Sequence, residues 1–340
     1  MNLSRLLVVL CLTFASFTYA DEPPAYPGPN KADEPNRSFS VAAAAQFLDA
    51  ASDDWGKNRK CFACHTNYSY LFAQPCLKLD TATAKETRRQ LEELVEKRWV
   101  EGKPRWDAEV VMTAATLALH DAATTGKLHA TTRTSLDRMW TIQREDGGFD
   151  WLKCNWPPME SDDHFGAEMA LIAVGSAPED YARGEVPQQG IAKLKKYLAA
   201  HPPPTVHHQA MLLWSAAYVP DLLSAEVKAE SIKQLRELQK PDGGWCVATL
   251  GQWKRGDKKE QDTETSDGYA TGFVVYVLRK SGVPAADPAL VKGVAWLKQN
   301  QRESGRWFTR SLFKDNMHYL SHAGTAFAVL ALDSCAELKD

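Results

Sequence analysis

After residue 20, the 340-residue chain has no run of the roughly eighteen apolar residues that a membrane-spanning helix requires. It also lacks a basic stripe, because 40 Lys and Arg residues are balanced by 43 Asp and Glu residues. The first absence excludes a transmembrane protein. The second argues against a nucleic-acid partner, which would need a concentrated positive surface.

Residues 1–20 have the pattern of a secretory signal peptide. Arg5 supplies the positive start, residues 6–17 form a short apolar run, and small residues precede a cleavage site after Ala20. We therefore expect an exported protein, periplasmic or extracellular. Residues 21–37 are rich in Pro and charge, which predicts a disordered linker. Residues 38–340 are long enough to bury the core of a single domain.

A C-x-x-C-H motif lies close behind this linker, formed by Cys61, Cys64 and His65. In c-type haem attachment, two such thiols add to the vinyl groups and the histidine becomes an axial ligand of the iron. The motif therefore predicts haem c. A local disulfide and half of a zinc site are the two alternatives. Candidates for the sixth iron ligand are His164, His207, His208, His322 and Met112.

Six cysteines remain once the leader is removed. Unligated thiols in an oxidising compartment tend to pair. The four cysteines outside the motif could therefore form two disulfides, and the sequence leaves their connectivity open. These four are Cys76, Cys154, Cys246 and Cys335.

Three segments share the pattern Gln-x-x-x-Gly-x-aromatic, at residues 143–149, 239–245 and 301–307. Each follows an amphipathic stretch and precedes a more apolar one. We interpret each as a helix end with a glycine turn, where the aromatic ring folds back onto the helix and the Gln binds free backbone groups. The repeat predicts a helical-hairpin unit.

Laid over the chain, this unit predicts an all-α fold in which six amphipathic helices alternate with six apolar ones. The amphipathic set is expected at 41–57, 83–99, 132–143, 190–200, 225–239 and 289–301. The apolar set is expected at 65–72, 107–120, 163–174, 206–218, 268–279 and 322–332. Apolar helices lie inside and amphipathic ones outside, which makes an (α/α)6 toroid. The inner helices then all begin at one rim of the barrel.

The three repeats resemble the QW motif of the squalene-cyclase and protein-prenyltransferase superfamily, and the opening of the last apolar stretch, Gly324-Thr325-Ala326, is similar to that family's inner helices. The resemblance covers about residues 38–332 and implies the same toroid. It implies a terpene cyclase or prenyltransferase as the type of enzyme.

Two further segments are similar to functional motifs of that superfamily. Residues 160–163 resemble the Asp-rich motif in which a protonated Asp starts cyclisation, so Asp162 and Asp163, with the adjacent His164, are candidate catalytic residues. Helix capping is the alternative interpretation. Asp267 and His322 match two of the three prenyltransferase zinc ligands, although Tyr269 stands in place of the third, a Cys.

Two functions follow from these patterns. The first is an exported toroid that binds haem c, exchanges electrons with a partner protein and acts on or binds an apolar ligand such as an isoprenoid or lipid. If it is an enzyme, it would be an oxidoreductase. The alternative is a haem-free terpenoid- or lipid-binding protein or a small terpene cyclase-like lyase or isomerase, with zinc as its metal.

Overall fold

The computed structural model describes residues 28 and 30–339, apart from 60, 79 and 155. Over this part of the chain it is helical and contains no β-strand beyond isolated bridges. The expected leader, residues 1–20, lies outside the described residues. Among those residues, no helix is long and apolar enough to cross a membrane.

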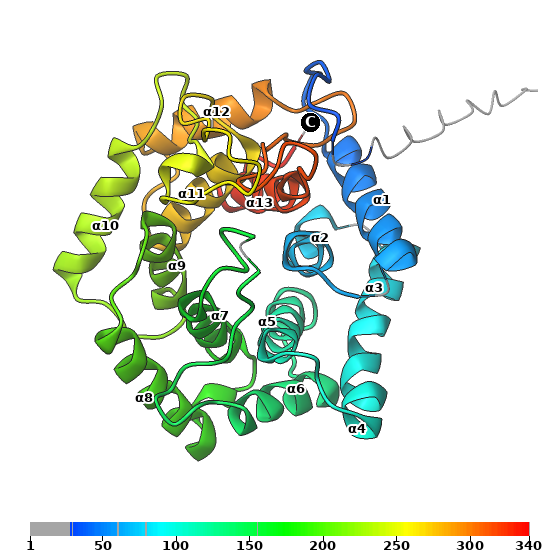
Figure 1. The fold of residues 1–340 in the computed structure, drawn as a ribbon, viewed down its shortest axis with the longest axis vertical. Coiled ribbons are helices and arrows are strands. Elements are labelled where there is room, and N and C mark those ends of the chain that lie inside the picture. The colour runs from blue at the N-terminus through cyan, green and yellow to red at the C-terminus, as the bar shows by residue number, and fades with distance from the viewer. Residues whose placement is uncertain (1–27, 29, 60, 79, 155, 340) are drawn as a thin grey trace, which may run out of the picture.

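The helices form two concentric rings (Figure 1). The outer ring contains α1 (Val41–Arg59), α3 (Ala82–Glu93) with its short extension α4 (Trp99–Glu101), α6 (Ala130–Thr141), α8 (Glu185–Ala200), α10 (Ala225–Glu237) and α12 (Pro288–Gln299). The inner ring contains α2 (Ser69–Leu77), α5 (Asp107–Thr124), α7 (Asp163–Ser176), α9 (Val206–Ala216), α11 (Gly268–Lys280) and α13 (Leu320–Ser334). The predicted α/α toroid is therefore confirmed.

The three repeats join neighbouring outer helices. The amide of Gln143 donates to the carbonyl of Gly190 on α8, and that of Gln239 donates to Ala289 on α12. The glycine of each turn has a positive φ, for example +92° at Gly243, where its Cβ position would meet the carbonyl of Lys292 at 2.9 Å. Only glycine accommodates both this backbone conformation and this close approach.

The tryptophans of the second and third repeats fold back as the pattern predicted. The indole of Trp245 donates to the carbonyl of Leu235 on α10 at 2.6 Å, and that of Trp307 donates to Leu297 on α12 at 2.7 Å. Both rings are fully buried. Each indole thus satisfies a carbonyl near the end of an outer helix and fills space between the outer and inner helices.

The expected linker is only partly a linker. Glu34 is buried, its carboxylate lies 3.2 Å from the fully buried guanidinium of Arg306, and the Arg37 N–H donates to the carbonyl of Gln301. Charge and proline content suggested disorder over 21–37, but residues 34–37 pack against the third repeat. A buried arginine requires a carboxylate partner, and the linker supplies it.

The centre of the inner ring is filled by aromatic side chains. Trp214 contacts Tyr276 and Phe327 edge to face, with centroids 5.4 and 5.9 Å apart, and Phe273 packs on Phe327 at 5.3 Å. All four are buried. These residues therefore form a packed aromatic core at the centre of the inner ring.

Candidate functional site

The C-x-x-C-H motif leads into an inner helix through an unusual turn. Residues Cys64–Tyr68 form a π-helical turn directly before α2. Such turns cost hydrogen-bond geometry and frequently occur at functional sites. Here the turn sets His65 at the rim where the inner helices begin.

Aromatic neighbours and one hydroxyl hold the His65 ring. It packs edge-on to Trp55 at 4.8 Å and parallel to Tyr319 at 5.4 Å between centroids. Its Nδ1 lies 2.7 Å from Thr66 Oγ1. Burial lowers the pKa of His65 to about 3, so the imidazole is neutral, the form that binds metals. Nδ1 is engaged, so Nε2 is the nitrogen left to act as a ligand.

A cavity of about 600 Å³ opens beside this histidine. Ligand pockets in proteins typically measure about 300–1,000 Å³. Its walls combine aromatic rings, two basic side chains and one thioether. The lining includes Trp55, Arg59, Cys61, His65, Trp106, Lys153, Trp156, Glu160, Met317 and Tyr319.

Cys64 lies behind this wall, next to Glu160. The Glu160 carboxyl group accepts from the thiol of Cys154 at 3.1 Å and also contacts the Cys64 thiol. Burial, with Glu160 nearby, raises the pKa of Cys154 to about 12 and that of Cys64 well above its ordinary value. Both thiols are therefore protonated, and both are adjacent to the cavity.

The expected pair of disulfides is absent from the described residues. The six cysteines from Cys61 to Cys335 are free thiols. Cys246 Sγ donates to the carbonyl of Asp262, whereas Cys76 contacts Asp333. The export context suggested pairing, but the fold gives the four residues separate environments.

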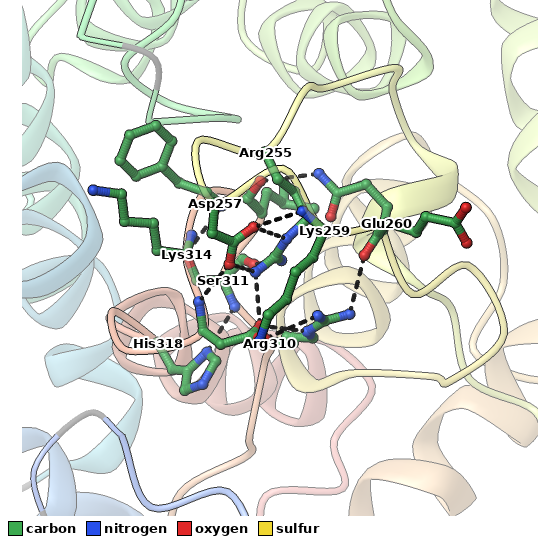
Figure 2. Close-up of polar contacts among 12 residues, drawn as sticks. Arg255, Asp257, Lys259, Glu260, Arg310, Ser311, Lys314 and His318 are labelled. Carbon is green, nitrogen blue, oxygen red and sulfur yellow. Dashed lines mark hydrogen bonds and ion pairs between the residues drawn. The ribbon is translucent and has the colours of Figure 1, made fainter.

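A network of charged side chains holds the loop that carries Met317 and Tyr319. Figure 2 shows Arg255 at its centre, and its fully buried guanidinium contacts the carboxylates of Asp257 and Asp315, both at 2.6 Å. Arg255 also donates to the carbonyl of Ser311. The loops before α11 and α13 are thereby tied together, and one wall of the cavity is fixed in place.

The histidines proposed as the sixth iron ligand lie elsewhere. His322 Nδ1 contacts the same Thr66 hydroxyl as His65, at 2.8 Å, so it stands beside His65. His207 donates to or accepts from Tyr269 and stacks on Phe273 inside the barrel. Neither these two nor His164, His208 and Met112 line the cavity, whereas Met317 does. Met317 lies about 250 residues from the motif in a loop without periodicity, so no sequence pattern placed it beside the motif.

Asp162 and Asp163 occupy the start of α7. Asp162 is its N-cap and accepts the N–H groups of His164 and Phe165. Although burial opposes ionisation, a hydrogen bond from His208 keeps the pKa of Asp162 below its ordinary value. Asp163 accepts from Arg144 at 2.8 Å. Asp162 therefore matches the capping alternative, because a protonated acid would need a raised pKa, whereas Asp163 forms an ion pair.

Asp267 also serves as an N-cap, for α11. Its oxygens accept the N–H groups of Ala270 and Val247, and burial raises its pKa to about 7. Its carboxylate and His322 belong to no group of three ligand-type side chains among the described residues. The zinc interpretation of this pair stays a prediction.

No protein-family profile and no curated protein sequence matches this chain. Several solved structures match the chain. The chain is similar to the type II terpene cyclase MstE from Scytonema at 12% identity and a TM-score of 0.52, covering 88% of this chain and 98% of that one. An α-1,6-mannanase from Salegentibacter sp. HEL1_6 matches at 10% identity and a TM-score of 0.53, covering 88% and 100%.

A glycosidase variant matches at 11% identity and a TM-score of 0.56, covering 90% of this chain and 100% of that chain. The chain spans 50% of ent-copalyl diphosphate synthase from Streptomyces platensis, at a TM-score of 0.49. Cyclases, glycosidases and a polysaccharide lyase share this architecture. The protein is thus an α/α toroid, and because this fold hosts several chemistries it does not define the reaction.

Proposed function

We propose that this protein is an exported c-type haem protein that transfers electrons. Cys61 and Cys64 would carry the thioether bonds and His65 would ligate the iron. The observation that carries the proposal is the placement of the C-x-x-C-H turn against a cavity of about 600 Å³ with aromatic walls and a methionine. A disulfide alone would need no such cavity.

The residues present fit the group. Cys61 and His65 line the cavity, and Cys64 contacts Glu160, which also lines it. Trp55 and Tyr319 orient the imidazole and shield it from water, and Thr66 engages its Nδ1, which is the kind of support that metal-binding histidines have. Bound haem would supply one-electron oxidation and reduction.

Two further features support particular roles. Met317 supplies a thioether in the same lining, so we propose that it, in place of the histidines considered above, would be the second protein ligand of a bound haem iron. Arg59 and Lys153 place positive charge in the lining, which suits the carboxylates of a haem.

Trp106 also lines the cavity and is 54% exposed. An exposed aromatic ring of this kind is a suitable contact for a redox partner protein, and we propose that the partner docks there.

A second function is supported by the same aromatic walls. Without haem, the cavity would suit an isoprenoid or lipid chain, and a variant of the solved cyclase MstE was determined with geranylgeranyl dihydroxybenzoate as its substrate. In that case the ligand would bind beside His65, because the barrel centre is packed with aromatic side chains.

The test is to export the full chain in a host that attaches haem c and to measure a pyridine haemochrome after denaturation. We expect covalent haem in the wild type and its loss in the Cys61→Ser, Cys64→Ser double variant. Cys154→Ser is the matched control, since this thiol lines the same cavity but lies outside the motif. A colourless wild type that binds a fluorescent fatty acid or isoprenoid would instead support the second function.

A further inference from the structure

A second group of ligand-type side chains lies outside the C-x-x-C-H motif, on the inner helices α7 and α9. His164 and Glu168 are one turn apart on α7, and His208 lies on the neighbouring inner helix α9. Residues four apart on a helix share a face. One donor atom from each of the three lies within 4.8 Å of the others, and all three are buried.

Glu168 stands between the two imidazoles. Its Oε1 is 2.9 Å from His164 Nδ1, and its Oε2 is 2.9 Å from His208 Nδ1. Two ring nitrogens and one carboxylate therefore converge from two rigid helices. Sequence reasoning missed Glu168 because its position inside an apolar helix gave no sign that two histidines would meet it.

The other nitrogen of each ring also faces an acceptor. His164 Nε2 is 3.2 Å from the carbonyl of His201, and His208 Nε2 is 3.1 Å from Asp162 Oδ2. Carbonyl and ionised carboxylate oxygens only accept hydrogen bonds, and a neutral imidazole has one N–H. With that N–H at Nε2, each Nδ1 directs a lone pair at the Glu168 carboxylate.

A positive charge between Glu168 and the two rings would complete these contacts. A second proton on His208 alone would serve its two carboxylate neighbours, whereas a second proton on both rings would place two buried imidazolium rings with centroids 4.9 Å apart. Like charges at this distance repel strongly inside a protein. One divalent cation supplies the same charge and leaves both rings neutral.

We propose that His164, Glu168 and His208 bind a zinc ion that ties α7 to α9. Two imidazole nitrogens and one carboxylate oxygen form a donor set that Zn²⁺ favours. The contacts from His208 to Asp162 and from His164 to the His201 carbonyl are the outer contacts that orient metal-binding histidines. The site is independent of the proposed haem and differs from the Asp267 and His322 pair.

The first test is the zinc content of the exported full chain, purified without chelator and measured by mass spectrometry. We expect about one zinc per chain, and about one-tenth of that or less in Glu168→Gln, because the charged ligand is lost. His201→Gln is the matched control. Its imidazole contacts the Tyr197 carbonyl and the Tyr197 ring, and the backbone carbonyl near His164 is kept.

Asp162→Asn separates a metal site from a structural cluster. Asn caps helices as well as Asp does, so α7 keeps its N-cap. The charged acceptor of His208 is lost, and we expect zinc affinity to fall about 10- to 100-fold. Unchanged affinity in this variant would contradict the proposed role of Asp162 in orienting His208.

The wild type provides a test that needs no variant. X-ray absorption at the zinc edge should show nitrogen and oxygen ligands, including two imidazoles, and no sulfur. Adding zinc to the chelator-treated chain should raise its melting temperature, whereas adding magnesium should not. A wild type that contains no zinc and shows no shift on titration would overturn the proposal, as would sulfur ligation, which would assign the metal to the cysteines.

Discussion

Gln301 exchanges two hydrogen bonds with the backbone of Ser40, although 261 positions separate them in the chain. Its Oε1 accepts the Ser40 N–H at 2.7 Å, and its Nε2 donates to the Ser40 carbonyl at 2.9 Å. Gln143 and Gln239 each donate to the next outer helix in the chain. At Gln301 the same device joins the last outer helix to the first and so closes the ring.

Ring closure predicts a large effect for Gly305→Ala. Gly305 has φ +93°, and a Cβ would lie 2.0 Å from the carbonyl oxygen of Ala43 on α1. The left-handed backbone costs about 1–2 kcal/mol for a residue with a Cβ, and the overlap adds about 1–3 kcal/mol. We expect the free energy of unfolding, measured with denaturant, to fall by more than about 2 kcal/mol.

Gly282→Ala is the control for that substitution. Gly282 also has a positive φ, +89°, but nothing lies within 4 Å of its Cβ position. The free energy of unfolding of this variant should fall only by the cost of the left-handed backbone, about 1–2 kcal/mol. Equal losses in the two variants would show that the contact with α1 does not matter.

The charged network around Arg255 predicts a pH dependence. Hydrogen bonds from Arg255 hold the pKa of Asp257, and hydrogen bonds from Arg310 hold that of Asp315, below the ordinary value of 3.8. The folded state therefore binds fewer protons than the unfolded state. The stabilisation is present above pH 3.8 and is lost as the pH falls through the lowered pKa values.

We expect hydrogen exchange in the loop before α13 to accelerate below pH 3.8, after correction for the intrinsic rate. Asp257→Asn should show faster exchange already at neutral pH and a smaller change on acidification. Asp221→Asn, in the turn between α9 and α10, is the control. If acid leaves the protection of this loop unchanged, the network does not hold the cavity wall.

Met317→Leu tests the second axial position. If the haem is bound as proposed, the wild type has both axial positions filled, and its reduced form should not bind carbon monoxide. The variant keeps the shape of the side chain but loses the sulfur, so its reduced form should bind carbon monoxide and shift the visible spectrum. His322→Gln, which changes the histidine beside Thr66, should behave as the wild type. If the reduced wild type itself binds carbon monoxide, Met317 is not a ligand of the iron.

The free cysteines predict a simple chemical result. Alkylation of the denatured, unreduced and haem-free protein should label all six cysteines, and the haem-bound protein should show four labels. Intact mass measurement distinguishes these states. A count lower by two in haem-free protein would reveal a disulfide.

Much of the fold could be predicted from local pattern. The start of α1 at Val41 and of α9 at Val206 was predicted to the residue, because capping and the change from polar to apolar residues are local signals. The roles of the repeat Gln and Trp residues were also predicted, since each side chain binds backbone carbonyls in the turn or helix end of its own repeat. The partner of Gln301, by contrast, could not be identified before the ring was seen to close.

By itself, the sequence determined the alternation of inner and outer helices, the glycine turns and the position of Cys61, Cys64 and His65 at the head of an inner helix. Tertiary structure alone decided that Met317 joins this motif at one cavity, that Glu168 lies between two histidines, and that the barrel centre is filled. Spacing along a chain specifies the face and the turn on which a residue lies. Which residues meet across the barrel depends on how segments far apart in sequence pack together, and no local signal encodes that.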